Sequence, residues 1–284
     1  MKRPAVAPVI YLDTCAVLAV RSYLDEAKQR KWWPYSEAQQ PTAPPRSAQM
    51  VPGYEEQLRK GYAVMAYLLK RSTDECVVVV SWVVRTEAIR VLTLGGVYRS
   101  MASCFALPTP KLRRIEEGNM VRGWMTQEEV GRLPKCLDDC LDDIKTHTQV
   151  DLRQQSQRDR RQDEALGCVE IVLSHRFMDL GDAWLLAEAL TEQAEEVITF
   201  DTDFRLVLER LRQPASAPDD ERALYRRMKE EVQTKLGEML GRGDTPGGVV
   251  LPKACKLDMP KMSELECMQR AISSKAQGSD APTA

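Results

Sequence analysis

The sequence predicts an α/β protein with three layers, in which helices cover both faces of a central parallel sheet. Two short runs of β-branched and aromatic residues, 9–12 and 197–200, are each followed at once by a carboxylate. Segments with helical spacing separate such runs, as expected for strands that are buried on both faces of a parallel sheet. The carboxyl ends of parallel strands form the edge where α/β proteins bind ligands. We therefore expect Asp13 and Asp201, which follow the two runs, to meet at this edge.

The first half of the chain alternates predicted strands and helices. The residue patterns indicate strands at 9–12 and 76–80, and helices at 14–31, 54–71 and 82–94. Ser81 is a favourable N-cap for the third helix, whereas Gly95 and Gly96 should loosen or end it. The stretch 37–53 is rich in Pro, Ala, Gln and Ser and is expected to be a loop.

The second half of the chain is more charged. Residues 111–161 should form helices outside the sheet, with an interruption at Pro134. The next segment, 165–175, is apolar, and its periodicity does not decide between helix and strand. The remaining expectations are helices at 179–193, 204–212 and 219–240, strands at 196–200 and 247–251, and a disordered end at 273–284. The resulting organisation is a core of residues 1–110 and 162–255, a helical insertion at 111–161, and a partly disordered tail at 256–284.

Composition narrows the class of protein. The 284 residues are 43% hydrophobic and carry a net charge of −2, so a nucleic-acid-binding surface would have to be a local basic patch. No apolar run approaches the about 18 residues that a membrane helix needs, and the first residues lack the apolar core of a signal peptide. We expect a cytoplasmic protein with no membrane partner. The eight scattered cysteines are then interpreted as reduced thiols.

The two histidines of the chain and two neighbouring cysteines are candidates for metal ligands or catalytic groups. Cys136 and Cys140 lie one helical turn apart and His147 follows, so a zinc site is one interpretation, and a buried helical face is the favoured one. His175 precedes the predicted helix at 179–193 and is expected to be structural.

Four carboxylates stand out by their placement among the 42 acidic residues. Asp13 and Asp201 directly follow strands. Asp182 is expected on the inward face of its helix, because the apolar residues follow it by three, four, seven and eight positions: Leu185, Leu186, Ala189 and Leu190. Each has a structural alternative: Asp13 and Asp201 could cap the next helix, and Asp182 could complement a helix dipole, with Asp179 as the cap.

Glu87 is the fourth carboxylate. It shares one face of a helix that is apolar nearly all round, together with Val83, Val84 and Val91. A buried carboxylate is costly unless it is paired or binds a cation. The structural alternative is an ion pair with Arg85 or Arg90, or a side chain turned toward solvent.

Taken together, these motifs resemble a PIN domain, the metal-dependent ribonuclease family best known from bacterial toxin–antitoxin pairs. The motifs are Tyr-Leu-Asp-Thr at 11–14, a Glu in the helix after the second strand, Asp-Ala-x-x-x-Ala-x-Ala at 182–189, and Thr-x-Asp-x-Asp-Phe at 199–204. The likeness covers both ends of the core and residues 76–94. It implies a PIN-like fold with an acidic quartet for catalysis and metal binding: Asp13, Glu87, Asp182 and Asp201. It also implies Asp203 as an additional metal ligand and the hydroxyls of Thr14 and Thr199 as supporting groups.

The sequence departs from the family pattern at two points. Cys15 stands where many members have Asn or Ser, and the separation between Glu87 and Asp182 is far longer than in the small toxins. The long separation indicates a helical insertion in a toxin-type nuclease, and a substrate or partner unlike those of the small toxins.

The resemblance and the residue chemistry point to one function. Oxygen ligands select Mg²⁺ or Mn²⁺, and such ions can activate a water and stabilise charge on a phosphodiester. We expect a Mg²⁺- or Mn²⁺-dependent endoribonuclease, acting as a toxin or defence effector. The expected partners are an RNA substrate, an inhibitor protein or antitoxin, and a second copy of the chain as a homodimer.

Substrate affinity would have to come from basic residues. The candidates for phosphate contacts are Lys111, Arg113 and Arg114. The run 153–161 has four arginines, but interleaved acids favour a solvated helix. Aromatic residues at 32, 33 and 35 could stack on bases, although packing is the favoured interpretation, and the acids at 138–143 are expected to form a solvated helix face.

Two other functions were weighed. A PIN-like domain with an inactive metal site could serve as a binding module in a larger assembly. The Phe-Asp-Thr-Asp sequence at 200–203 also resembles the motif of haloacid dehalogenase-type phosphohydrolases. That motif should open its domain, and here it lies near the end of the core, so this interpretation is disfavoured.

Overall fold

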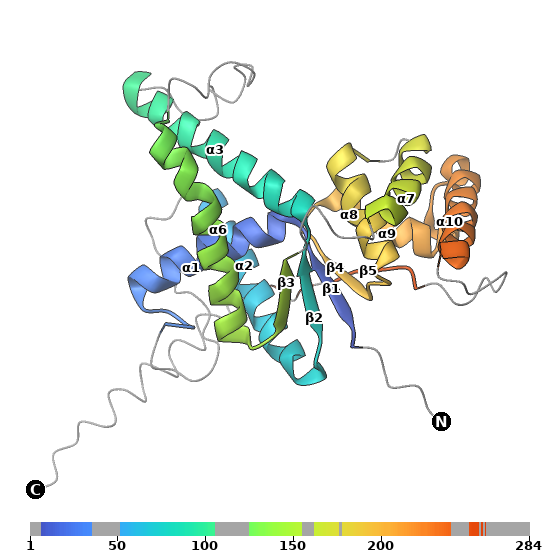
Figure 1. Cartoon of the computed structure of the whole chain (residues 1–284), viewed down its shortest axis with the longest axis horizontal. Coiled ribbons are helices and arrows are strands. Elements are labelled where there is room, and N and C mark those ends of the chain that lie inside the picture. Colours follow the sequence, from blue (N-terminus) through green and yellow to red (C-terminus); the bar gives the residue numbers. More distant parts are fainter. Residues whose placement is uncertain are drawn as a thin grey trace, which may run out of the picture.

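The fold is built on a five-stranded sheet whose strands are all parallel, in the order β3-β2-β1-β4-β5 (Figure 1). The structure is a computed structural model, and it describes residues 7–35, 52–105, 125–154, 162–175, 178–239, 250–255, 257 and 259. The strands are β1 (Val9–Leu12), β2 (Val77–Val80), β3 (Asp151–Gln154), β4 (Glu196–Ile198) and β5 (Lys253–Ala254). The predicted α/β class with a parallel sheet is therefore confirmed.

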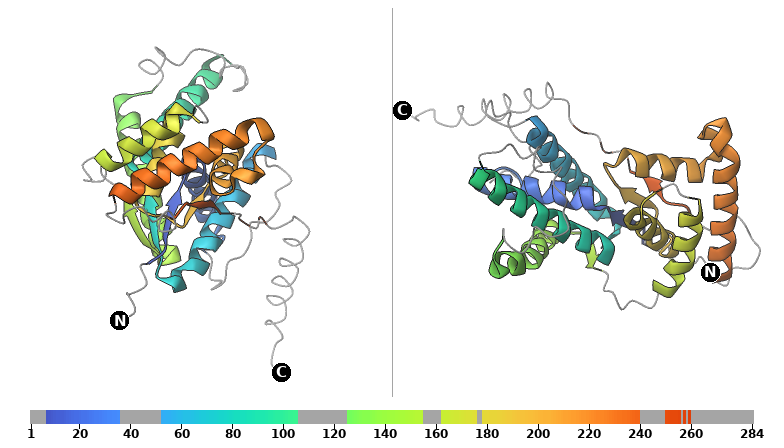
Figure 2. Two further views of the ribbon diagram at one scale, coloured as in Figure 1. Left: turned by 90° about the vertical axis from the view of Figure 1, so that its right-hand side faces the viewer. Right: turned by 90° about the horizontal axis from the view of Figure 1, so that it is seen from above.

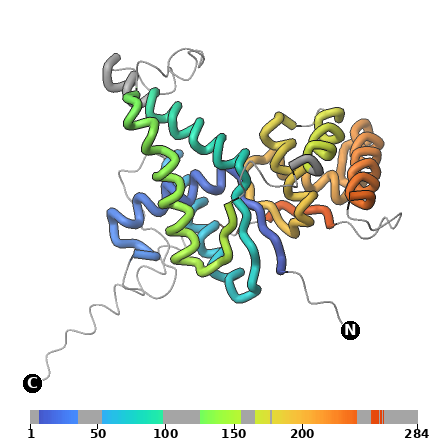
Figure 3. Tube along the Cα trace, in the orientation of Figure 1, coloured from blue at the N-terminus to red at the C-terminus, as the bar shows by residue number. Residues whose placement is uncertain are grey.

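Strands β1 and β2, which lie inside the sheet, are apolar because helices cover both faces of the sheet. All four residues of β2 are buried, and Ile10 in β1 is fully buried between Val78 and Glu196 of the neighbouring strands. Burial on both faces explains why these strands read as continuous β-branched runs rather than as alternating patterns. The trace in Figure 3 shows how β1 and β4, which are distant in sequence, run side by side.

Helices lie on both sides of the sheet, consistent with the three layers expected (Figures 1 and 2). One side holds helices from the first half of the chain: α1 (Thr14–Arg30), α2 (Pro52–Arg71), α3 (Trp82–Phe105) and α6 (Gln127–Thr148). The other side holds helices from the second half: α7 (Gln162–Ser174), α8 (Leu180–Thr191), α9 (Thr202–Arg212) and α10 (Asp219–Met239).

The closest helix contact is between α1 and α2, and it depends on a glycine. A Cβ atom at Gly61 would lie 2.2 Å from the carbonyl oxygen of Ala19 and 2.6 Å from the Cβ of Tyr23. Trp33 and Tyr62 complete an aromatic cluster with Tyr23, with ring centroids 5.8–6.4 Å apart. The packing interpretation of the aromatic residues after α1 is therefore confirmed for Trp33, which is 4% exposed.

Residues 125–154 differ from the prediction in two ways. Pro134 lies inside α6 and does not interrupt it. Residues 151–154 are not helical, because they form β3 and pair with β2 at the edge of the sheet. The expectation that residues 111–161 lie wholly outside the sheet is therefore wrong. An edge strand tolerates charged, exposed side chains, and β3 lacks the apolar residues by which a buried strand is recognised.

Several other predicted boundaries are corrected. Helix α3 continues through Gly95 and Gly96 to Phe105, residues 165–175 fall mostly in helix α7, and β4 ends at Ile198 rather than at residue 200. The last strand of the described residues is at 253–254; residues 250 and 251 are not in a strand, and 247–249 lie outside the described residues. The expectations for residues 37–51 and 273–284 lie outside the described residues.

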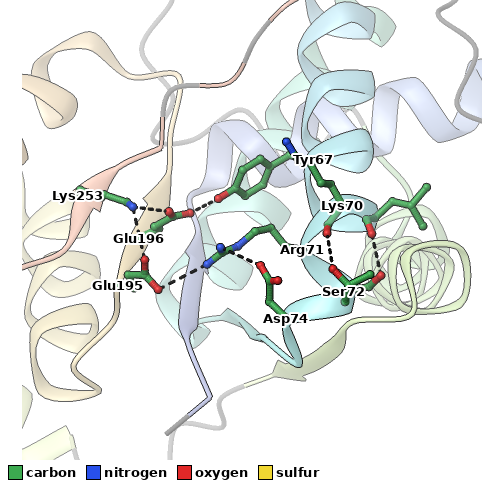
Figure 4. Close-up of polar contacts among 10 residues, drawn as sticks. Tyr67, Lys70, Arg71, Ser72, Asp74, Glu195, Glu196 and Lys253 are labelled. Atoms are coloured by element: carbon green, nitrogen blue, oxygen red, sulfur yellow. Dashed lines mark hydrogen bonds and ion pairs between the residues drawn. The ribbon is translucent and has the colours of Figure 1, made fainter. Parts of the chain in front are cut away.

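The amino end of the sheet carries an ionic network that fastens the short strand β5 (Figure 4). Lys253 Nζ lies 2.8 Å from Glu196 Oε1 and 3.5 Å from Glu195 Oε1. The Tyr67 hydroxyl donates to Glu196, and Arg71 Nη2 lies 3.5 Å from Glu195 Oε2. Burial raises the pKa of the Glu196 carboxyl, but the hydrogen bonds from Lys253 and Tyr67 outweigh it and hold this pKa below its ordinary value.

Six cysteines of the structure are free thiols: Cys15, Cys76, Cys136, Cys140, Cys168 and Cys255. Cys140 lies in the core, which confirms the interpretation of its position as a buried helical face. None of the described helices is long and apolar enough to cross a membrane.

Candidate functional site

The candidate site lies at the carboxyl edge of the sheet, where three helices begin directly after strands. Asp13 links β1 to α1, Ser81 links β2 to α3, and Asp201 precedes α9 shortly after β4. The strand order also reverses between β1 and β4, since β2 and β3 continue on one side and β5 on the other. Such a switch point leaves a crevice at the carboxyl ends of the strands, which is where open α/β sheets bind ligands.

Asp13 lies at this switch point and is 5% exposed. Its Oδ1 accepts a hydrogen bond from the Thr14 backbone N–H at 2.6 Å, which makes it the N-cap of α1. Its Oδ2 accepts from Thr199 Oγ1 at 2.7 Å and from Cys15 Sγ at 3.0 Å. Burial raises the pKa of the Asp13 carboxyl, the hydrogen bonds lower it, and the nearby charge of Asp201 adds to the rise. Asp13 is thus both a helix cap and a member of a carboxylate cluster.

Glu87 extends from α3 toward the same place. Its Oε2 accepts a hydrogen bond from Thr14 Oγ1 at 2.6 Å. A Cβ atom at Gly181 of α8 would lie 4.0 Å from that oxygen. The expectation that Glu87 lies in a buried helix is wrong, because Glu87 is exposed and Val91 is 42% exposed.

Arg85, one of the two arginines considered as an alternative partner of Glu87, is engaged elsewhere. Arg85 pairs with Asp138 of α6 and donates to Gln154 Oε1 of β3 at 2.7 Å.

A second acid of α6, Asp143, accepts from the Tyr35 hydroxyl at 2.7 Å. The expectation that the acids at 138–143 form only a solvated face is therefore wrong for Asp138 and Asp143, which connect α6 to neighbouring elements.

Asp182 shows most directly that the carboxylates influence one another. It lies in the first turn of α8, which Asp179 caps by accepting from the Asp182 N–H at 3.0 Å. The pKa of Asp182 is raised to about 7, first by burial and then by the charges of Asp179, Asp13, Asp201 and Glu87. Carboxylates from four separate elements thus repel one another at this edge.

Asp201 joins the cluster while capping α9. Its Oδ1 accepts from the N–H groups of Asp203 at 2.7 Å and Phe204 at 3.0 Å. Its own N–H donates to Thr199 Oγ1 at 3.0 Å. Asp203 is exposed in the first turn of α9. The capping alternative is therefore realised for Asp201, as it is for Asp13, and the cap uses only one of the two carboxylate oxygens of Asp201.

The two threonine hydroxyls contact carboxylates of the cluster. Thr14 donates to Glu87, and Thr199 donates to Asp13 while accepting from the Asp201 N–H. Thr199 is buried, and its contact with Asp13 joins residues that are 186 positions apart. A supporting role of these hydroxyls in metal binding stays a prediction.

Cys15 and Asp179 were not predicted as members of the site. The Cys15 Sγ donates to Asp13 Oδ2, accepts from the Phe200 N–H at 3.0 Å, and lies 3.6 Å from Thr199 Oγ1. Burial and the charge of Asp13 raise the pKa of the thiol to about 12, so it is protonated near neutral pH. The only signal in the sequence was proximity: Cys15 is two residues from Asp13, and Asp179 is three from Asp182.

The donor types of the cluster fit a hard divalent cation. All five predicted ligands are carboxylates, and oxygen donors of this kind bind Mg²⁺ or Mn²⁺. A cation would also relieve the repulsion that, after burial, raises the pKa of Asp182. In the part of the chain that the structure describes, no three acidic, histidine or cysteine side chains are already assembled closely enough to hold one ion. Binding would therefore require the carboxylates to draw together.

The remaining predicted residues lie elsewhere. Lys111, Arg113 and Arg114 are outside the described residues. Arg153 is exposed on β3, with its Nε 3.4 Å from Asp151 Oδ2. His175 contacts α10, where its Nε2 lies 3.4 Å from Glu231 Oε2, far along the chain from the cluster.

No protein-family model, curated protein or solved structure matches this chain. The resemblance to PIN domains therefore depends on the motif residues alone.

Proposed function

We propose that this protein is a PIN-like endoribonuclease that depends on Mg²⁺ or Mn²⁺. The observation that supports this proposal best is the hydrogen bonding at the carboxyl edge of the sheet, where Thr199 joins Asp13 to the Asp201 N–H and Thr14, next to Asp13, donates to Glu87. In this proposal the cation is held by Asp13, Glu87, Asp182 and Asp201, with Asp203 as an additional ligand.

The chain's own residues would prepare this site. Thr199 and the N–H of Thr14 hold the two oxygens of Asp13, and the Thr14 hydroxyl holds Glu87. These contacts fix carboxylates that would otherwise repel one another. A bound divalent cation would supply water activation and charge stabilisation at a phosphodiester. The location at the switch point between β1 and β4 is independent support, because it does not depend on the family resemblance.

The biological setting follows from the same resemblance. We propose RNA as the substrate and a role as a toxin or defence effector in the cytoplasm. An inhibitor protein or antitoxin, and a second copy of the chain, are the proposed protein partners. The substrate-binding role of Lys111, Arg113 and Arg114 remains part of this proposal.

A catalytically inactive binding module is the second candidate. Asp13 and Asp201 already serve as helix caps, which is a sufficient structural reason for an aspartate at each position.

A cleavage assay separates the two candidates. The wild-type protein with Mg²⁺ or Mn²⁺ should cleave single-stranded or structured RNA, and EDTA should stop the reaction. Asp13→Asn removes a charged ligand but keeps the helix cap, so turnover should be lost without a fall in thermal stability. Asp142→Asn, on the exposed surface of α6, is the matched control and should cleave normally. If Asp13→Asn cleaves RNA like the wild type, catalysis by these carboxylates is excluded. Binding of RNA without cleavage by the wild type would support the binding module.

A further inference from the structure

We propose that Cys15 is a positioning residue that couples Asp13 to the segment preceding α9, and that this coupling sets the cation affinity of the carboxylate cluster. The inference rests on the proposed function, which it deepens. It concerns a residue at which the chain departs from the family pattern, so it does not follow from the resemblance.

The geometry assigns two simultaneous hydrogen bonds to one thiol. Cys15 Sγ donates to Asp13 Oδ2 at 3.0 Å and accepts from the Phe200 N–H at 3.0 Å. A thiol is both a weak donor and a weak acceptor, and here both capacities are used. Alanine provides neither, whereas serine provides both.

The two contacts join the carboxyl ends of neighbouring strands. Cys15 and Asp13 follow β1, and Phe200 follows β4 with Asp201 as its next residue. Thr199 bridges the same two segments, because it donates to Asp13 and accepts from the Asp201 N–H. Cys15 and Thr199 thus hold Asp13 and Asp201 at a fixed separation from two sides.

A chemical role for the thiol is not supported. Reactive cysteines lie in electropositive, partly exposed surroundings, whereas the Sγ atom of Cys15 lies against the Asp13 carboxylate and the Phe200 N–H. The contact with Asp13 Oδ2 is one that a thiol can donate and a thiolate cannot. Cys15 therefore acts through Asp13 and through the backbone of Phe200.

The effect of substitution is predicted from this arrangement. Residues that orient metal ligands typically change metal affinity or activity by about 10–100-fold when they are removed. Cys15→Ala should weaken Mn²⁺ binding and lower kcat for RNA cleavage within that range, while the KM for RNA stays unchanged. Cys15→Ser should restore most of both losses, because the hydroxyl repeats the two hydrogen bonds.

Cys76→Ala is the matched control. Cys76 is a buried free thiol, whereas Cys15 is half-buried, and Cys76 precedes β2 and so lies at the opposite edge of the sheet from the cluster. Its truncation to alanine removes the same Sγ atom without touching Asp13 or Phe200. An equal loss of Mn²⁺ affinity in Cys76→Ala would show that the effect is general destabilisation, and would overturn the proposal.

The experiment combines Mn²⁺ binding by calorimetry, RNA cleavage kinetics and hydrogen exchange at the Phe200 amide. We expect faster exchange of this amide in Cys15→Ala than in wild type, with recovery in Cys15→Ser and no change in Cys76→Ala. Wild-type affinity, kcat and Phe200 exchange in Cys15→Ala would overturn the inference. If the wild type neither binds Mn²⁺ nor cleaves RNA, the proposed function fails, and hydrogen exchange still decides whether Cys15 couples the two segments.

Discussion

At the scale of single residues, Asp13 and Asp201 each cap a helix and also belong to the carboxylate cluster at the edge of the sheet. Asp201 uses Oδ1 to accept two backbone N–H groups of α9. Asp13 uses Oδ1 for the Thr14 N–H and Oδ2 for side chains. An aspartate that caps a helix at the end of a parallel strand therefore also lies at the edge where ligands bind. The capping and functional interpretations of such a residue do not exclude each other.

Asp182 should make the stability of the protein fall as pH rises. Its pKa is 3.8 in the unfolded reference and about 7 when folded, so the folded protein binds more protons between these values. Asp182→Asn removes this penalty. It should stabilise the protein by about 1 kcal/mol at pH 8, a value that allows for partial solvent exposure, and by nearly nothing at pH 3.5.

Thermal unfolding of both proteins at the two pH values measures this difference. Asp142→Asn, with an exposed side chain, is the control for loss of one negative charge. A stabilisation of equal size at both pH values would contradict the assignment of the penalty to the charged form of Asp182.

The residue types of the cluster could be predicted from the sequence, but their surroundings could not. Strand-terminal aspartates and helical spacing were sufficient to single out Asp13, Asp182 and Asp201. Periodicity identified the face of α3 that carries Glu87, but it could not show that Glu87 is exposed while Val84 on the same face is buried. The contact between Cys15 and Phe200 joins two distant segments, and local patterns do not encode such a contact.

At the scale of elements, β5 is a two-residue strand whose attachment depends on few contacts. The Lys253 N–H donates to the Glu195 carbonyl at 3.0 Å, and the Cys255 N–H donates to the Val197 carbonyl at 2.9 Å. The Lys253 ammonium adds ion pairs with Glu195 and Glu196. Glu196 is 4% exposed, so the charge of its carboxylate depends on this partner.

Lys253→Gln should therefore destabilise the protein in a pH-dependent way. Because the pKa of Glu196 is held below its ordinary value of 4.5, its contribution to stability is present above that pH and is lost as the pH falls through the lowered value. We expect a loss of about 1 kcal/mol at pH 7 and a much smaller loss at pH 3, measured by urea unfolding. Lys70→Gln, at an exposed neighbouring lysine, should be nearly neutral. An equal loss at both pH values would contradict the ion-pair explanation.

Helix α6 contains a proline at its eighth position, and the helix continues through it. Pro134 has no N–H to donate to the Val130 carbonyl, and its ring disturbs the preceding turn. Pro134→Ala should stabilise the protein by up to about 3 kcal/mol, measured by urea unfolding at pH 7. A loss of stability instead would mean that the packing of α6 requires the proline geometry.

The elements that could be predicted are those with strong local signals. Helix α6 was expected as part of a charged helical region, although its interruption at Pro134 was wrong. The capping box of Thr126 and Glu129 that starts the helix is a local signal that the prediction did not use. Strand β3 was missed because its residues are charged and exposed, and only pairing with β2 makes them a strand. Edge strands of this kind cannot be distinguished from loops or charged helices by pattern alone.

At the scale of the whole molecule, topology assembles the site. The placement of β4 beside β1 brings Asp201 to Asp13, and the crossover through α3 and α8 brings Glu87 and Asp182 from opposite sides of the sheet. The sequence could predict the parallel sheet and the strands that precede Asp13 and Asp201, whereas the strand order had to come from the structure. The reversal of strand order between β1 and β4 is the feature that turns separate carboxylates into one cluster.

The central claim is that this cluster binds a divalent cation, and crystals soaked in Mn²⁺ test it most directly. Anomalous diffraction locates Mn²⁺ without any assumption about activity or substrate. We predict an anomalous peak coordinated by carboxylate oxygens of Asp13 and Asp201, with Glu87 and Asp182 as direct or water-bridged ligands, and no such peak in Asp13→Asn crystals. A wild-type crystal with no peak at this edge of the sheet at saturating Mn²⁺, or with peaks only elsewhere, would contradict the claim.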